Sequence, residues 1–247
     1  MEKINKLYGV SFDSEYKGYE NIVVDIFEND NLEYDLTDKK ILNIIGVYYH
    51  VKIKNYDEMK KHYQMAINLN YARSMKNFGY YYQTIEKNYD EAKKLYLMAI
   101  ELNYAEAMFN MGFLYDHIEK NNIEANKYYI MAAKLNDVKS MCNLGKYYMD
   151  NKNYNEAKKY YQMAIELGYA NAMFSLGCYF RDVEKNNDEM IKYYLMAVEL
   201  NHEKSLNAIC EFYDSKILLS LLKPLKSQIA KDMVEVLEKT TFVNDKL

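Results

Sequence analysis

The sequence predicts an all-α fold made of one pair of antiparallel helices that is repeated along the chain. Two sets of small residues recur at a nearly constant spacing. One set lies 33, 33, 33 and 32 residues apart and consists of Gly46, Gly79, Gly112, Gly145 and Gly177. The other recurs at 33, 33, 32 and 33 residues and consists of Ala66, Ala99, Ala132, Ala164 and Ala197. The chain of 247 residues has one proline and eight glycines, which favours helices joined by short turns.

Residues 1–36 precede the first repeat. Their apolar stretch, Ile22, Val23, Val24, Ile26 and Phe27, fits a short helix or a strand, and its periodicity does not decide between them. We interpret residues 1–36 as an N-terminal cap, because the first unit of a repeat array has no neighbour to bury its outer face.

The repeat array covers residues 37–213, with five complete helix pairs and a sixth first helix at residues 203–213. In each first helix a large apolar residue stands four positions before the glycine and an aromatic residue three positions after it, as at Met108, Gly112 and Tyr115. This spacing places all three on one helical face, where the small residue lets a neighbouring backbone come close. In the sixth first helix Cys210 takes the place of the glycine.

The second helix of each pair carries an alanine or methionine seven positions before its recurring alanine, with a tyrosine between them, as at Ala92, Tyr96 and Ala99. We expect the alanines to admit the partner helix and the tyrosine to fill the remaining gap. The residues after each second helix, Asn70, Asn103, Asn136, Gly168 and Asn201, tolerate the left-handed conformation that ends a helix.

Residues 214–247 leave the repeat pattern. They begin with an aliphatic patch, Ile217, Leu218, Leu219, Leu221 and Leu222, and continue after Pro224 with a helical stripe of Ile229, Met233 and Val236 or Leu237. We interpret them as C-terminal capping helices and a tail, which cover the last repeat. The alternative is a dimerisation face through which two copies self-associate.

Charge and composition disfavour nucleic acid as a partner. The net charge is −4, whereas phosphate binding needs a basic surface. Lysine pairs such as Lys60-Lys61 follow acids by three or four residues, which predicts ion pairs on an outward face. An RNA-binding stripe is the alternative, and the interleaved acids argue against it.

The sequence predicts no catalytic, cofactor or metal site. The four histidines, His50, His62, His117 and His202, form no i, i+4 pair, and no catalytic motif is present. Cys142, Cys178 and Cys210 are spaced by the repeat and lack the close ligand pairs of a zinc site. We therefore expect a protein that is not an enzyme.

The expected location is the cytoplasm. The odd number of cysteines fits a reducing compartment, and the amino terminus lacks the apolar core and cleavage site of a secretory signal. The longest mostly apolar run near the start, residues 41–51, is far shorter than the ~20 residues that a membrane helix needs. We therefore expect no membrane association.

Two stretches resemble known repeat families. A tetratricopeptide repeat is resembled by residues 105–115 and 124–135, which have the sequences AEAMFNMGFLY and EANKYYIMAAKL. The junction AIELGYANAMFSLG, at residues 164–177, is similar to the related Sel1-like repeat. The proline that usually follows a tetratricopeptide second helix and the Gly-x-Gly-Val insertion of Sel1-like repeats are both absent. The Asn- and Tyr-rich repeats also resemble Sel1-like paralogues of giant DNA viruses.

The resemblance implies a right-handed α-solenoid that acts as a non-enzymatic scaffold for protein–protein interaction. In such arrays the first helices line a concave groove that binds a peptide or a helix. Carried over by position, the groove residues are Arg73, Lys76, Tyr80, Phe109, Asn110, Phe113, Lys139, Lys146, Phe174 and Arg181. Lys76, Asn110 and Lys139 also match three positions with which some tetratricopeptide domains clamp a terminal carboxylate, whereas Tyr80 and Asn143 depart from that pattern.

Overall fold

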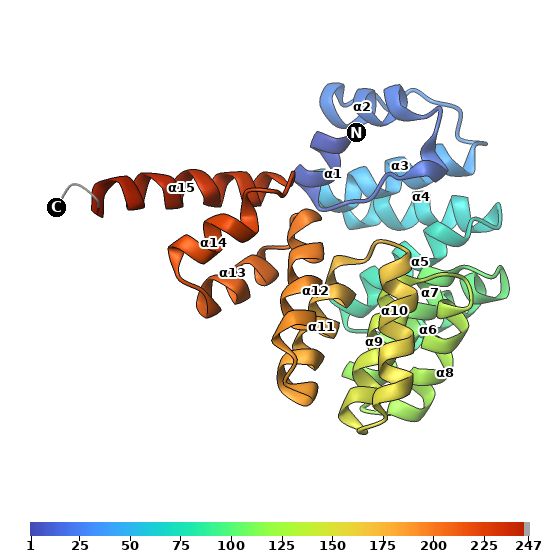
Figure 1. The fold of residues 1–247 in the computed structure, drawn as a ribbon. Coiled ribbons are helices and arrows are strands. Elements are labelled where there is room, and N and C mark those ends of the chain that lie inside the picture. The colour runs from blue at the N-terminus through green and yellow to red at the C-terminus, as the bar shows by residue number, and fades with distance from the viewer. Residues whose placement is uncertain (245–247) are drawn as a thin grey trace. The chain divides into compact units, whose positions relative to one another are not determined.

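The computed structural model describes the backbone of residues 1–244 and the side chains of residues 1–239 (Figure 1). Every regular element within residues 1–244 is helical, which confirms the predicted all-α solenoid of helix pairs. The chain forms two compact units, Met1–Tyr128 and Tyr129–Leu247, and each is described by itself. The predicted boundaries after residues 36 and 213 stay predictions.

Unit 1 begins with two helices outside the repeat. These are α1 (Glu2–Tyr8) and α2 (Glu20–Asn29), and the short 3-10 turn η1 (Ser14–Tyr16) lies between them. The stretch that fitted a helix or a strand is therefore helical. The repeated pairs follow as α3 (Lys39–Tyr48) with α4 (Tyr56–Asn68), α5 (Ala72–Tyr81) with α6 (Tyr89–Glu101), and α7 (Ala105–His117) with α8 (Asn122–Ala133), in which the unit ends.

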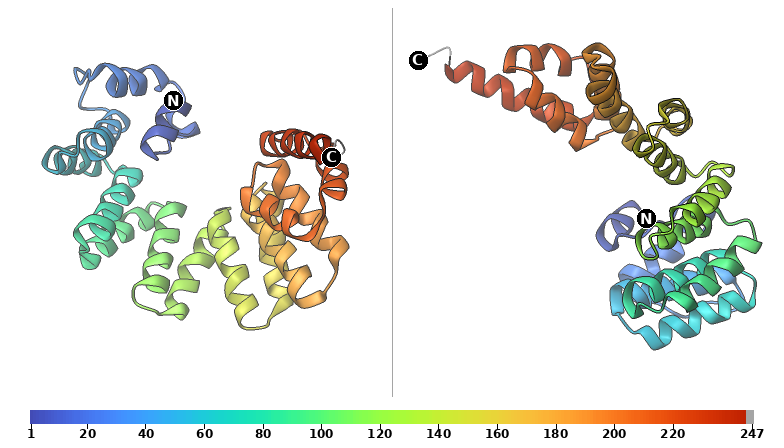
Figure 2. Two further views of the ribbon diagram at one scale, coloured as in Figure 1. Left: turned by 90° about the vertical axis from the view of Figure 1, so that its left-hand side faces the viewer. Right: turned by 90° about the horizontal axis from the view of Figure 1, so that it is seen from below.

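Unit 2 continues the alternation. Its pairs are α9 (Val138–Asp150) with α10 (Tyr154–Glu166), and α11 (Ala170–Tyr179) with α12 (Asn187–Glu199). The last helices are α13 (Glu203–Phe212), α14 (Ser215–Leu222) and α15 (Gln228–Asn244). In both units the two helices of a pair lie side by side (Figure 2).

The repeated register of the glycines is explained mainly by a tyrosine ring, with a backbone carbonyl somewhat further away. A Cβ on Gly79 would lie 2.7 Å from Tyr96 Cε1, and a Cβ on Gly177 would lie 2.5 Å from Tyr194 Cε1. Both tyrosines belong to the second helix of the same pair and are fully buried. The expectation of a closely approaching backbone was therefore only partly correct, because the tyrosine side chain fills that space.

The turn inside each pair was not predicted from the sequence. In three pairs the first helix ends in a π-helical turn, η2 (Tyr49–Ile53), η3 (Tyr82–Glu86) or η4 (Phe180–Glu184). A recurring Lys-Asn dipeptide follows in all five pairs. The lysines, Lys54, Lys87, Lys120, Lys152 and Lys185, have φ between 55° and 59°.

The asparagine of that dipeptide starts the second helix. The side chain of Asn88, for example, accepts a hydrogen bond from the backbone amide of Glu91 at 3.2 Å, which satisfies one of the free donors of a helix start. At the other end of the second helices the left-handed conformation is confirmed, with φ of 55° at Asn70 and 76° at Gly168.

The C-terminal helices bury most of the aliphatic patch within unit 2. Leu218 and Leu222 are 5% and 1% exposed and share a core with Ile209 and Leu237. The Glu199 carboxylate accepts hydrogen bonds from the backbone amides of Lys226 and Ser227 and thereby fixes the start of α15. This packing supports the interpretation of residues 214–239 as a cap.

Candidate functional site

The predicted groove residues divide between the two units. Unit 1 holds Arg73, Lys76 and Tyr80 on α5 and Phe109, Asn110 and Phe113 on α7. Unit 2 holds Lys139 and Lys146 on α9, Phe174 on α11 and Arg181 in η4. Within each unit these residues lie on first helices or, for Arg181, in the turn that follows one, and their environments differ strongly.

Arg73 is bound by the chain itself. Its guanidinium donates from Nε to Glu15 Oε2 at 2.8 Å, from Nη1 to the Ser11 carbonyl at 3.0 Å and from Nη2 to Asp13 Oδ2 at 2.7 Å. The side chain is only 6% exposed. The Arg73 side chain, which the sequence predicted to bind a ligand, is therefore bound by a segment of the chain itself. We call this segment, residues 10–17, the strap.

The strap is also held by side chains of α3 and by Tyr71, the residue before α5. Tyr16 is fully buried, accepts a hydrogen bond from Asn43 Nδ2 at 2.5 Å and lies against the guanidinium of Arg73. The hydroxyl of Tyr71 donates to Glu15 Oε1 at 2.6 Å, and Lys40 Nζ donates to the Glu15 carbonyl at 2.5 Å. Burial works against the charge of Asp13, but its hydrogen bonds from Arg73 and the backbone outweigh burial and lower the pKa of Asp13.

Lys76 and Asn110 also have partners within unit 1. Lys76 Nζ lies 2.7 Å from Glu106 Oε2, so this ion pair connects α5 with α7. Burial acts to raise the pKa of Glu106, but the charge of Lys76 outweighs it and lowers that pKa. Asn110 is hydrogen-bonded to the hydroxyl of Tyr96. Two members of the predicted carboxylate clamp are thus engaged in contacts between helices.

Aromatic side chains make up the accessible part of this face. The ring of Tyr80 is 50% exposed on α5. On α7 the residues Phe109, Phe113 and His117 follow one another at steps of four and form a row along one face. The rings of Phe113 and His117 stack at 4.0 Å with an angle of 8°, and Phe109 and Phe113 are 6.3 Å apart.

In unit 2 the predicted residues are partly engaged. Lys139 and Lys146 are exposed on α9. The ring of Phe174 stacks on Tyr194 at 5.5 Å and lies 5.3 Å from His202. Arg181 donates two hydrogen bonds to its neighbour Asp182, at 2.7 and 2.9 Å. Phe174 therefore contributes to packing as well as to the surface.

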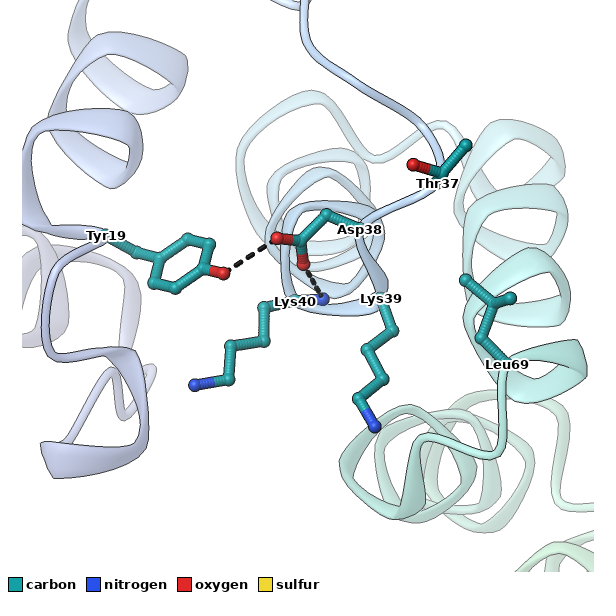
Figure 3. Close-up of a pocket in the computed structure, with 6 residues that line it drawn as sticks. All are labelled: Tyr19, Thr37, Asp38, Lys39, Lys40 and Leu69. Atoms are coloured by element: carbon teal, nitrogen blue, oxygen red, sulfur yellow. Dashed lines mark hydrogen bonds between the residues drawn. The ribbon is translucent and has the colours of Figure 1, made fainter.

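An open cavity of about 430 Å³ lies at the start of α3 (Figure 3). Its lining comprises Tyr19, Thr37, Asp38, Lys39, Lys40 and Leu69. Asp38 Oδ1 accepts from the Lys40 amide, and Asp38 Oδ2 accepts from the Tyr19 hydroxyl at 2.7 Å, so the carboxylate caps the helix and ties it to the residue before α2. This polar wall has a structural explanation and shows no arrangement for catalysis.

The cysteines behave as small packing residues. Cys142, Cys178 and Cys210 are free and half-buried, and burial raises the pKa of Cys142 and of Cys210. Among the described residues no group of three or more His, Cys, Asp or Glu side chains could hold a metal ion. Within the same part of the chain, no helix is both long and apolar enough to cross a membrane.

Comparisons with known families identify the repeats. The model of the Sel1 repeat matches residues 72–104, 105–137 and 170–202, and a model of the tetratricopeptide repeat matches residues 138–167. The matched segments follow one another within residues 72–202 and cover four helix pairs of the array. No curated protein matches the sequence.

Solved structures share the fold at low sequence identity. A Sel1 repeat protein from Oxalobacter formigenes is 22% identical with a TM-score of 0.59, and the match covers 90% of this chain and 92% of that one. The protective antigen c5321 of uropathogenic Escherichia coli, which displays the Sel1-like fold, is 15% identical with a TM-score of 0.61, over 82% of this chain and 50% of that one. A chain of the APC/C hetero-tetramer Cut9-Hcn1 is 18% identical with a TM-score of 0.57, over 96% and 51%.

The helix pairs, the packing of glycine on tyrosine and the family matches lead to one conclusion. The repeat array of this chain belongs to the Sel1-like and tetratricopeptide repeat superfamily.

Proposed function

We propose that this chain is a non-enzymatic scaffold that binds a peptide or a helix on the face of its first helices. Repeats of this superfamily are generally protein-interaction modules. The observation that carries the proposal is the accessibility of aromatic rings on α5 and α7, where Tyr80 is 50% exposed and the half-buried Phe113 stacks on the exposed His117. Exposed aromatic groups beside charged ones are typical of surfaces that anchor a protein partner.

The aromatic rings and the ion pair have different parts in this binding. Tyr80, Phe109 and Phe113 would bury apolar groups of the ligand, which provides most of the affinity. Lys76 and Glu106 already neutralise one another at 2.7 Å, so they would orient a ligand and contribute little net charge. The part of this face around Lys76 and Glu106 is therefore not expected to prefer acidic peptides.

Selection of binding peptides tests the proposal. A phage-displayed peptide library would be selected on the full chain, and the affinities of selected peptides would be measured by calorimetry. We expect Tyr80→Ala and Phe113→Ala each to weaken binding by at least about tenfold, because both remove an aromatic anchor.

Leu97→Ala is the matched control. Leu97 is 45% exposed, but it lies on the second helix α6. Its removal should leave the affinities unchanged. Equal affinities for the unmodified chain and both aromatic variants would refute binding at this face. A capture experiment with the same variants in the native cell, followed by mass spectrometry, would name the partner.

Self-association through the C-terminal end is the alternative from the sequence. Its support is narrow, because Leu218 and Leu222 are buried within unit 2 while Phe212 and Ile217 are 47% and 43% exposed. We expect the full chain to scatter light as a monomer. A dimer that becomes monomeric when Phe212 and Ile217 are both changed to serine would favour the alternative.

RNA binding has weaker support than either. Lys61, Lys94 and Lys159 each pair with a glutamate three residues earlier, as the sequence predicted, so these charges are already neutralised. The cytoplasmic location and the resemblance to viral paralogues, which suggests an assembly or host-facing role, stay predictions.

A further inference from the structure

The strap has the form of a bound peptide. It lies between Gly9 and Gly18, which have φ of 63° and 90° and open space where a Cβ would be. Both glycines have the backbone freedom of hinges. Between them the chain carries the sequence VSFDSEYK, with two carboxylates and two aromatic rings.

The polar part of the receptor for the strap is built by α3, α5 and the residue before α5, while the Phe12 ring of the strap packs on Phe27 of α2. Arg73 binds the carboxylates of Asp13 and Glu15, Tyr71 adds a second hydrogen bond to Glu15, and Asn43 binds the Tyr16 hydroxyl. A guanidinium fork between two carboxylates, with an aromatic ring on its face, is the usual chemistry of peptide recognition by arginine.

This receptor is not a property of the repeat. The positions equivalent to Arg73 in the other first helices are occupied by Lys40, Glu106, Lys139, Asn171 and Lys204. Arginine, with its fork of donors, therefore occurs at this register only in α5, the helix that faces the acidic strap. Arg73 also shares its helical face with Lys76 and Tyr80, so the strap occupies one end of the face that we propose for partner binding.

We propose that the strap is a built-in pseudo-ligand, and that the α3–α5 site accepts an external acidic and aromatic peptide of the pattern Phe-Asp-x-Glu-Tyr in its place. The inference rests on the proposed function, because it uses the same face of the first helices. It adds the chemical class of one ligand and a reason why the site is closed in the free chain. The strap competes at the high effective concentration of a tethered segment, about millimolar or above, so an external ligand must overcome this competition.

The test uses the full chain and a fluorescent peptide with the sequence of residues 9–18. In the strap variant Asp13→Asn with Glu15→Gln, the tethered competitor has lost its charges while the receptor is intact. We expect the peptide to bind this variant at least about tenfold more tightly than the unmodified chain. A peptide with Asn and Gln at its two acidic positions should bind the variant at least about tenfold more weakly, and so should the acidic peptide when Arg73→Gln is added.

Two results would overturn the inference. One is equal binding, or equal lack of binding, of the acidic and neutral peptides to the folded strap variant. The other applies even if that variant does not fold: in the unmodified chain, the amides of residues 10–17 should exchange with deuterium faster than those of α3 and α5. Exchange of the strap only together with α3 and α5 would show that it never leaves the site.

The outcome can be separated from that of the proposed function. Tyr80→Ala should weaken the library peptides but leave the strap peptide unchanged, because Tyr80 has no contact with the strap's carboxylates. If the strap peptide fails and the library peptides still depend on Tyr80, only the pseudo-ligand is refuted.

Discussion

At the scale of single residues, the fold depends on the packing of a tyrosine ring against a glycine, which has no Cβ. Gly46, Gly79, Gly145 and Gly177 each lie against the tyrosine of the second helix of their pair, and the tyrosine ring covers the space that a side chain would need. Interiors packed this closely respond to the addition of a single methyl group.

Gly79→Ala should therefore destabilise the protein. The new Cβ would lie 2.7 Å from Tyr96 Cε1 and 3.2 Å from the Ala92 carbonyl oxygen, and a buried ring can move little. We expect a loss of about 1–3 kcal/mol in the free energy of unfolding, measured with denaturant. The control is Cys210→Ala, at the same register but already bearing a Cβ; a similar loss for both changes would contradict the ring contact as the cause.

Two carboxylates, Asp13 of the strap and Glu106 of α7, predict a pH dependence of stability. The pKa of Asp13 in the folded chain lies below its ordinary value of 3.8, and that of Glu106 lies below 4.5. Their stabilising contributions are thus complete above the unfolded pKa values and are lost as the pH falls through the lower folded ones.

We expect thermal stability to fall as the pH is lowered from about 5 toward 3, and less steeply in Arg73→Gln, which lacks the partner of Asp13. Circular dichroism melts at several pH values, with Lys146→Gln as the control for a changed surface cation, would measure both slopes. Identical slopes for Arg73→Gln and the unmodified chain would show that the strap's ion pairs do not stabilise the fold.

At the scale of elements, the turn within each pair is defined by a lysine in the left-handed region and an asparagine cap. The left-handed region disfavours all residues with a Cβ, and β-branched residues most. Glycine is the usual solution, so the recurring Lys-Asn dipeptide gave no clear signal in the sequence.

Substitutions of Lys87 test this strain. Lys87→Val should destabilise the chain by about 1–2 kcal/mol relative to Lys87→Gly, because valine tolerates the left-handed region least and glycine adopts it freely. Lys87→Gly itself should leave stability unchanged or slightly higher. Chemical denaturation of both variants gives the comparison, and equal stabilities would mean that the turn readjusts its backbone.

The sequence predicted the helix pairs well because their evidence is repeated. A glycine with an aromatic residue three positions later, as at Gly79 and Tyr82, occurs five times, and two alanines seven positions apart, as at Ala92 and Ala99, occur three times, so each copy supports the others. The strap occurs once, so no periodicity marked it. The contacts of Arg73 were not predicted for the same reason. Arg73 was correctly placed on the first helix, but the groups that bind it belong to residues 11–15, about sixty positions earlier in the chain. That Tyr80 and Phe113 bind a partner stays a prediction, because an aromatic side chain indicates which kind of group it can contact but does not identify the ligand.

At the scale of the whole molecule, ion pairs connect each repeat to the next inside the units. Lys60 on α4 lies 2.5 Å from Glu86, which belongs to the turn of the following pair, and Lys158 on α10 lies 3.1 Å from Glu184 in the same arrangement. Lys93 and Glu119 form the corresponding pair. Glu86 also accepts a hydrogen bond from the hydroxyl of Tyr81, and Glu184 accepts one from the hydroxyl of Tyr179.

Charge exchange tests the link between repeats. Lys60→Glu and Glu86→Lys should each destabilise the chain, while the double variant should regain part of the loss, with a coupling of about 0.2–1 kcal/mol that shrinks at high salt. Lys61→Glu with Glu58→Lys is the control, because that pair lies within one helix. A coupling no greater than in the control would show that the inter-repeat pairs add nothing to cohesion.

The single strap also bears on how the gene of such a protein can grow. Duplicating the 33 residues of a helix pair preserves the contacts between neighbours, so an array can lengthen by copying its own repeats. A copy that included α5 would bring a second arginine at the register of Arg73 but no second acidic strap. Its guanidinium would face solvent, as Lys139 does at the same register. Duplication should therefore multiply the helix pairs without multiplying the site that the strap closes.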